Sequence, residues 1–293
     1  PALKTAAPSR IALRAATERT LRRKMLSESW PLMVNHLLAT LFFKIDVPLM
    51  EAILGNEALG LYSTGYKYLD ALNVIPSMFT MALFPVISRK AVEDRAGFVR
   101  FFQLGVKILT LLVLPAAIIA TLGARELVLL LGGPEYLPGG MIALQLMAWS
   151  MVIGWTNSLT QYVLIALNQQ RYLMRAYMLA LSFNLIANLV LMPRFGYQAS
   201  ALLHTAAELM LFIPFTIRLY QQVGRLNWWG MLGKPLIAAV CAAPVAAVLF
   251  PLNRLAALVG ALLIYGVVSW RLRIFDAEER QVLAPVFGSR KGS

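Results

Sequence analysis

The chain has 293 residues, of which 59 % are hydrophobic and only 14 % are charged, with a formal net charge of +13 at pH 7. Soluble domains average roughly 45–50 % apolar residues, so this share and a mean hydropathy of +0.67 exclude an ordinary soluble protein. Nucleic acid is not an expected partner, because the basic residues form short clusters between apolar segments.

The first 29 residues are basic and polar. They begin with Pro1 instead of Met, and they lack the apolar core of a signal peptide. We expect the chain to be a piece of a longer protein that starts inside a basic cytoplasmic segment, residues 1–29.

Eight stretches after this segment reach the roughly 20 apolar residues that a helix needs to cross a bilayer. They are residues 30–54, 57–88, 101–123, 140–167, 172–192, 197–220, 234–251 and 254–270. Short connections carry turn residues, such as Gly55-Asn56 and Pro193-Arg194-Phe195-Gly196. The sequence therefore predicts an all-α, polytopic transmembrane helix bundle of about eight spans.

The basic residues predict the orientation. Most of the 27 Lys and Arg residues fall in the N-terminal segment, in the tail and in the connections that follow the second, fourth and sixth predicted spans. The exceptions are Arg125, Arg194 and Arg254 on the opposite side, and Lys44, Lys67 and Lys107 inside spans. By the positive-inside rule, both ends of the chain are predicted to be cytoplasmic, in the plasma (inner) membrane.

Ionisable residues interrupt the first span. A charge at mid-bilayer costs at least ~2.5–3.5 kcal/mol, so it survives where it faces protein or a watery cavity. His36, Lys44 and Asp46 fall on the polar side of the helix. Lys44 and Asp46 stand about 200° apart around the helix axis, so we expect each to find its partner on another helix or in water.

The second span carries a matching polar stripe. Ser63, Lys67, Asp70, Asn73 and Ser77 follow spacings of three and four residues, which allows Lys67 and Asp70 to touch. Two neighbouring helices with polar faces predict a common hydrated cavity. The alternative is a set of structural ion pairs that clamp the bundle.

Three more ionisable residues lie in later spans. Lys107 either faces the cavity or extends its ammonium to the cytoplasmic interface. His204 and Glu208 share one helix face at i, i+4 spacing, where they can relay a proton or bind a coupling cation. The structural alternative is that they form a hydrogen bond to another helix, and we favour this alternative.

Several motifs carry a family resemblance. The run KIDVPLMEAILGNEALGLYSTGYKYLDALNVIPSMFTMALFPVISR, the loop LLLGGPEYLPGGMIALQLMAW and the passage SFNLIANLVLMPRFGYQASALLHT stand in this order along the chain. They resemble the C-terminal half of polysaccharide flippases in the multidrug/oligosaccharidyl-lipid/polysaccharide exporter superfamily. The match covers residues 27 to about 222.

The resemblance implies the second lobe of a two-lobe transporter that flips a lipid-linked oligosaccharide by alternating access. Residues 30–222 would form a six-helix lobe, 223–273 two additional helices and 274–293 a cytoplasmic tail. The implied partners are a polyprenyl pyrophosphate oligosaccharide, membrane lipids and the missing N-terminal lobe, with no cofactor. The cavity lysines Lys44 and Lys67 would compensate the pyrophosphate charge.

The candidate site follows from this interpretation. We expect substrate binding at His36, Lys44, Asp46, Lys67, Asp70 and Lys107, and ion coupling at His204 and Glu208. No enzyme motif or metal-ligand set occurs. The alternatives are a drug or cation exporter of the same superfamily, a polytopic membrane glycan-modifying enzyme, and a scaffold that transports nothing.

Overall fold

The protein is described by a computed structural model that covers residues 27, 29–276 and 279–280. The predicted basic segment 1–29 therefore lies outside the described residues except for Ser27 and Ser29. The predicted tail 274–293 is described only at residues 274–276 and 279–280.

Helices make up nearly all of the described chain, and no strand occurs within it. A helix at 29–44 comes first. It is followed by α2 (Asp46–Leu72), α3 (Val74–Glu93), α4 (Arg95–Leu122), α5 (Ala124–Leu131), a 3-10 turn (Pro134–Tyr136), α6 (Gly139–Ala148), α7 (Ser150–Ala166), α8 (Gln170–Val223), a π-helical turn (Trp229–Gly233), α9 (Lys234–Leu249) and α10 (Arg254–Arg271).

Two of these helices reverse direction at a glycine. Gly55 in α2 has a φ of +80° and Gly196 in α8 has a φ of +67°, values that side chains with a Cβ rarely adopt. Each of α2 and α8 therefore consists of two arms. Both reversals fall at connections that the sequence predicts.

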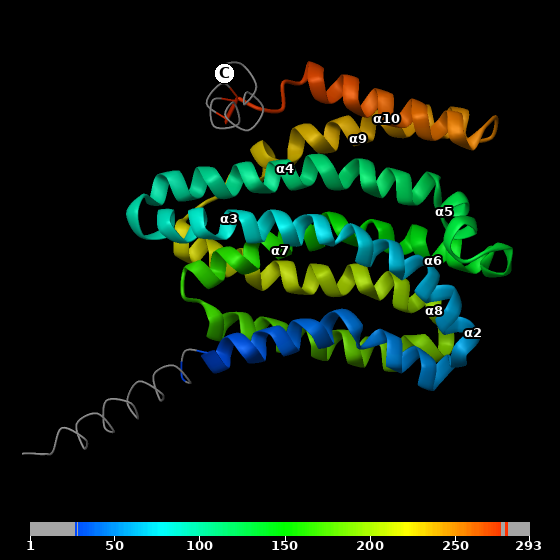
Figure 1. The fold of residues 1–293 in the computed structure, drawn as a ribbon, viewed down its shortest axis with the longest axis horizontal. Helices are drawn as coiled ribbons and strands as arrows, with labels where there is room; N and C mark the ends of the chain where they lie inside the picture. Colours follow the sequence, from blue (N-terminus) through cyan, green and yellow to red (C-terminus); the bar gives the residue numbers. More distant parts are fainter. Residues whose placement is uncertain (1–26, 28, 277–278, 281–293) are drawn as a thin grey trace, which may run out of the picture.

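Successive segments run in alternating directions along one axis (Figure 1). The links α3–α4, α7–α8 and α8–α9 gather at the same end of the bundle as the last described residues, and the opposite end holds α5 and the α9–α10 turn (Figure 1). This arrangement is the one that antiparallel membrane spans require. It places the predicted cytoplasmic connections at one end.

Length and hydropathy confirm a polytopic membrane bundle. Within the described residues, four helical segments are long and apolar enough to cross a membrane: α4, α8, the segment 229–249 and α10. A fifth is the pair α6 and α7, if this pair, bent by 46°, counts as one span. The helices between residues 29 and 93 are interrupted at Ile45, Gly55 and Asn73, so the expected number of eight spans stays a prediction.

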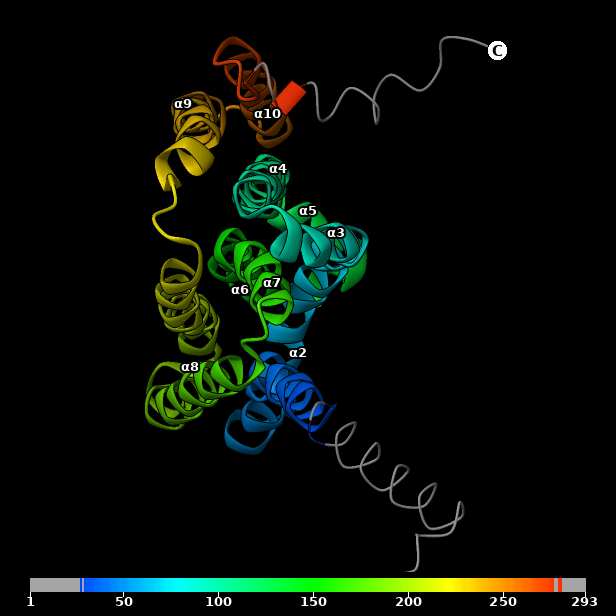
Figure 2. The same cartoon turned by 90° about the vertical axis from the view of Figure 1, so that its left-hand side faces the viewer.

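Small residues mediate the packing of the last two helices. The end-on view shows α9 and α10 at one edge of the molecule, beside α4 (Figure 2). Ala238, Ala242 and Ala261 are buried in this seam against Leu114. Small side chains let helix backbones approach closely in a membrane, where no hydrophobic effect drives association.

The outer surface is apolar as well. Met78, Ile186, Val240 and Leu263 are each more than half exposed. A soluble protein rarely exposes so many large apolar side chains, whereas acyl chains solvate them. Several polar side chains, among them Asn157, Asn184 and Glu208, are buried inside the bundle.

The α3–α4 link carries its own helix cap. The side chain of Asp94 accepts a hydrogen bond from the backbone N–H of Gly97, 2.8 Å away, in the first turn of α4. This backbone hydrogen bond holds the pKa of Asp94 below its usual value, and the ammonium of Lys90 adds to the effect.

We expect Gly65→Ala to lower the thermal unfolding temperature of the purified protein. A Cβ at this position would lie 2.7 Å from the backbone N of Leu144, so α2 and α6 would have to separate. Overpacking costs about 1–3 kcal/mol, and the higher helix propensity of Ala offsets up to about 1 kcal/mol. Gly266→Ala is the control, because its Cβ meets no atom within 4 Å. Equal melting temperatures for the two variants would contradict the close contact.

Candidate functional site

Two adjoining hollows lie between the first helices of the bundle. The outer hollow has a volume of about 450 Å³ and is lined by the helix at 29–44 and both arms of α2. The inner hollow has a volume of about 360 Å³ and extends to α3, α7 and α8. Thr40, Lys44, Tyr66 and Asp70 line both. The polar faces of the first two predicted spans therefore meet at one place.

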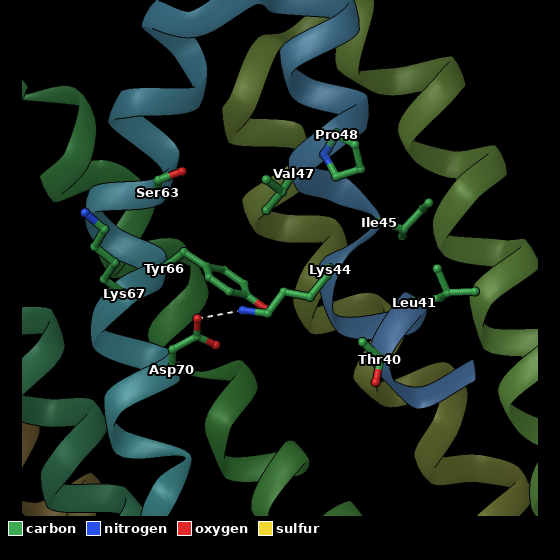
Figure 3. A pocket seen from close by; sticks show the side chains of 10 residues that line it. All are labelled: Thr40, Leu41, Lys44, Ile45, Val47, Pro48, Ser63, Tyr66, Lys67 and Asp70. Carbon is green, nitrogen blue, oxygen red and sulfur yellow. Dashed lines mark hydrogen bonds and ion pairs between the residues drawn. The ribbon is translucent and has the colours of Figure 1, made fainter. Parts of the chain in front are cut away.

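An ion pair stands on this shared wall. Lys44 Nζ lies 2.6 Å from Asp70 Oδ2 and 4.6 Å from the centroid of the Tyr66 ring (Figure 3). The two side chains are 49 % and 47 % exposed, so the pair is worth about 0–1 kcal/mol of stability. An ammonium has three N–H donors, and Asp70 takes one of them. Lys44 thus retains capacity for an anionic ligand.

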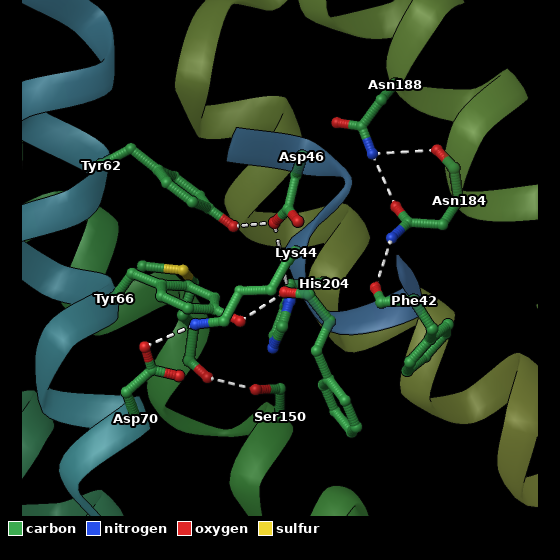
Figure 4. Close-up of polar contacts among 12 residues, drawn as sticks. Phe42, Lys44, Asp46, Tyr62, Tyr66, Asp70, Ser150, Asn184, Asn188 and His204 are labelled. Atoms are coloured by element: carbon green, nitrogen blue, oxygen red, sulfur yellow. Dashed lines mark hydrogen bonds and ion pairs between the residues drawn. The ribbon is translucent and has the colours of Figure 1, made fainter. Parts of the chain in front are cut away.

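Asp46 is buried behind this wall, at 2 % exposure. The hydroxyl of Tyr62 donates a hydrogen bond to Asp46 Oδ2, and His204 Nδ1 lies 3.9 Å from the same oxygen (Figure 4). Oδ1 has no hydrogen-bond partner among the described residues. The partners of Asp46 are therefore Tyr62 on the other arm of α2 and His204 on α8. Asp46 does not pair with Lys44, as their angular separation predicts, and it is enclosed by protein.

Glu208 forms a hydrogen bond with another helix. Asn157 Nδ2 on α7 donates to Glu208 Oε2 at 2.7 Å and to the backbone carbonyl of Glu208 at 2.9 Å. Both residues are buried and both line the inner hollow. His204 lines it as well, one helical turn away on the same face. The structural alternative is thus observed, and ion coupling stays a prediction.

His36 and Lys67 are exposed on the walls of the hollows. His36 lines the inner hollow, while Lys67 lines the outer one and points away from Asp70 (Figure 3). The contact that the sequence allows between Lys67 and Asp70 is not made, because Asp70 binds Lys44 on the neighbouring helix instead.

Lys107 lies elsewhere. It is buried in α4, and its ammonium lies 2.7 Å from both carboxylate oxygens of Glu279 in the C-terminal segment. It does not line either hollow. Glu279 compensates the charge of Lys107, and the expected contact of Lys107 with substrate stays a prediction.

Sequence reasoning missed several polar neighbours of the site. Tyr62 and Tyr66 look like ordinary apolar positions until the reversal at Gly55 brings their arm of α2 against the helix at 29–44. Tyr66 donates its hydroxyl hydrogen to the carbonyl of Phe43. Asn184 and Asn188 are buried, and Asn184 Nδ2 donates to the Phe42 carbonyl at 3.3 Å (Figure 4). Their four-residue spacing was the available signal.

The comparisons with known proteins give a family match over part of the chain. The family described as "Polysaccharide biosynthesis protein" matches residues 11–90, the part of the chain that contains Lys44, Asp46, Lys67 and Asp70. A comparison with curated proteins gives no significant match. Residues 11–90 are therefore similar to proteins that are described as acting in polysaccharide biosynthesis.

We expect Tyr62→Phe to destabilise the protein by about 1–3 kcal/mol, because it removes the hydroxyl that donates a hydrogen bond to the buried carboxylate of Asp46. Thermal unfolding of the detergent-purified protein measures the loss. Tyr220→Phe is the matched control, since Tyr220 is exposed on α8 and its hydroxyl has no partner in the described residues. The network would be unimportant if both variants melted together.

Proposed function

We propose that the chain forms a lobe of a transporter that moves a lipid-linked oligosaccharide, a polysaccharide precursor on polyprenyl pyrophosphate, across the inner membrane. One observation carries the proposal: an ion pair, Lys44 and Asp70, stands half-exposed on the wall of two hollows inside an apolar helix bundle. The family match over residues 11–90 supports the same substrate class.

The lysines provide the physical reason. A pyrophosphate that enters a low-dielectric space needs cationic compensation on its path. Lys67 has no ion pair within the described part of the chain, and Lys44 shares its charge with only one half-exposed carboxylate. A phosphate can therefore bind the ammonium of Lys67 directly, and it can replace Asp70 as the partner of Lys44.

The inner hollow suits the sugar. Its walls include neutral hydrogen-bonding side chains from α3 and α7, among them Ser77, Ser158 and Gln161. Hydroxyl and amide groups both donate and accept hydrogen bonds, as sugar hydroxyls do. Aromatic rings of Tyr162 and Tyr177 complete the lining and offer apolar faces.

Transport requires that the hollows open to each side in turn. We expect a second helical lobe of the same protein to supply the opposite wall of the cavity, and rocking of the two lobes to alternate its access. In this view, both ends of the chain face the cytoplasm.

A drug or cation exporter is the second candidate. The carboxylates Asp70 and Glu208 and the aromatic rings in the inner hollow are the groups that such a transporter would use. Lys44 and Lys67 oppose it, because they repel a cationic substrate.

We expect Lys44→Ala combined with Lys67→Ala to lower polysaccharide export at least tenfold in cells that depend on the full-length protein. A hydrogen bond to a charged group is worth about 1.5–3 kcal/mol, which corresponds to tenfold or more per contact. Surface polysaccharide is quantified at matched membrane abundance of the protein. Lys90→Ala, at the α3–α4 link, is the control. Normal export by the double variant would remove both lysines from the mechanism.

We expect Glu208→Gln to abolish the dependence of transport on a proton or sodium gradient in proteoliposomes. Glutamine retains an oxygen that accepts the Asn157 hydrogen bond, but it neither loses a proton nor carries a charge. Glu57→Gln, at an exposed position next to the Gly55 reversal, is the control. If Glu208 is only structural, the variant will keep its gradient dependence.

A further inference from the structure

A third hollow lies at the end of the bundle where the α7–α8 link and the first described residues meet. It has a volume of about 790 Å³ and is lined by the start of the first helix, the link at 168–169, the first turns of α8 and Arg218 near the end of α8. Asn35 Nδ2 donates to the Gln170 carbonyl at 2.8 Å, which ties the first helix to this link. We call it the basic hollow.

The described lining of the basic hollow is positively charged. Arg171, Arg175 and Arg218 line it, and no carboxylate does so in the described part of the chain. None of the three guanidinium groups forms an ion pair with a described residue. Arg171 and Arg175 are spaced i, i+4, so they share one face of α8.

Neutral groups hold Arg218 in place. Its Nε donates to Gln169 Oε1 and one terminal nitrogen donates to Gln221 Oε1, both at 2.8 Å. Its guanidinium also stacks over the ring of Tyr172, 5.2 Å from the ring centroid. These contacts fix the orientation of the side chain without neutralising it, and they leave three of its five N–H donors available.

The start of α8 adds to the positive potential. The helix begins at Gln170, and the side chain of its N-cap residue, Gln169, makes no capping hydrogen bond. The first N–H groups of a helix carry the positive end of its dipole and attract anions. The basic hollow thus combines a helix N-terminus with an oriented arginine and two further arginines.

We propose that the basic hollow binds the phosphate of an anionic membrane lipid. Phosphate oxygens accept the paired donors of guanidinium groups, and basic pockets at the ends of membrane helices are suited to anionic headgroups. Leu32 lines it and is exposed, Trp30 and Met33 are exposed on the same helix, and together these side chains offer an apolar surface for the acyl chains. This surface favours a lipid over free phosphate, and the site does not depend on the proposed transport function.

The test measures lipid binding to the purified full-length protein by native mass spectrometry. We expect phosphatidylglycerol to bind at least tenfold more tightly than phosphatidylcholine. The triple variant Arg171→Gln, Arg175→Gln, Arg218→Gln should lose this preference. The control variant Arg89→Gln, Arg225→Gln changes arginines that are predicted to face the same leaflet but do not line the hollow, and it should keep the preference.

Further arms make the test decisive. Arg175→Gln alone leaves the hydrogen bonds of Arg218 intact and guards against misfolding of the triple variant; it should weaken phosphatidylglycerol binding severalfold. Inorganic phosphate at millimolar concentration should not displace the lipid. Equal preference in the triple and control variants, or displacement by inorganic phosphate, would overturn the assignment to a lipid.

Discussion

The structure depends on how a low-dielectric bundle accommodates ionised side chains. An isolated charge at membrane depth is expensive, so each such group needs a partner or water. Lys44 and Asp70 meet the first requirement, because they pair at 2.6 Å, and both side chains are about half exposed on the wall of the hollows. A bundle that is held together by apolar packing alone would not contain such an ion pair.

Three solutions to the same constraint occur along the chain. The Lys44–Asp70 pair is open to a hollow and therefore available to a ligand. Asp46 is buried with Tyr62 and His204, and Lys107 is buried with Glu279 from the C-terminal segment. Groups that are fully enclosed hold helices together, whereas half-exposed groups can exchange partners. Lys44 therefore remains open to a ligand, whereas the ammonium of Lys107 is already paired with a carboxylate.

The arginines of the basic hollow differ from both kinds of charge. They lie at a bundle end, where water and lipid headgroups screen them, and they are oriented by neutral amides and a tyrosine ring instead of carboxylates. Like charges repel one another, so three arginines around one hollow favour the binding of an anion. The hollows near Lys44 and this basic hollow thus differ in the charged groups that line them.

The sequence by itself determined the membrane bundle, its reversals at Gly55 and Gly196, and the polar faces of the first two predicted spans. Composition and periodicity are local properties, and a helix in lipid must satisfy its backbone internally. Only the tertiary structure decided the pairing. Asp70 had a candidate ion-pair partner, Lys67, on its own helix, whereas Lys107 had no candidate partner in its own span. In the structure Asp70 pairs with Lys44, 26 residues away in the chain, and Lys107 pairs with Glu279, 172 residues away. Only the tertiary packing brings these pairs into contact.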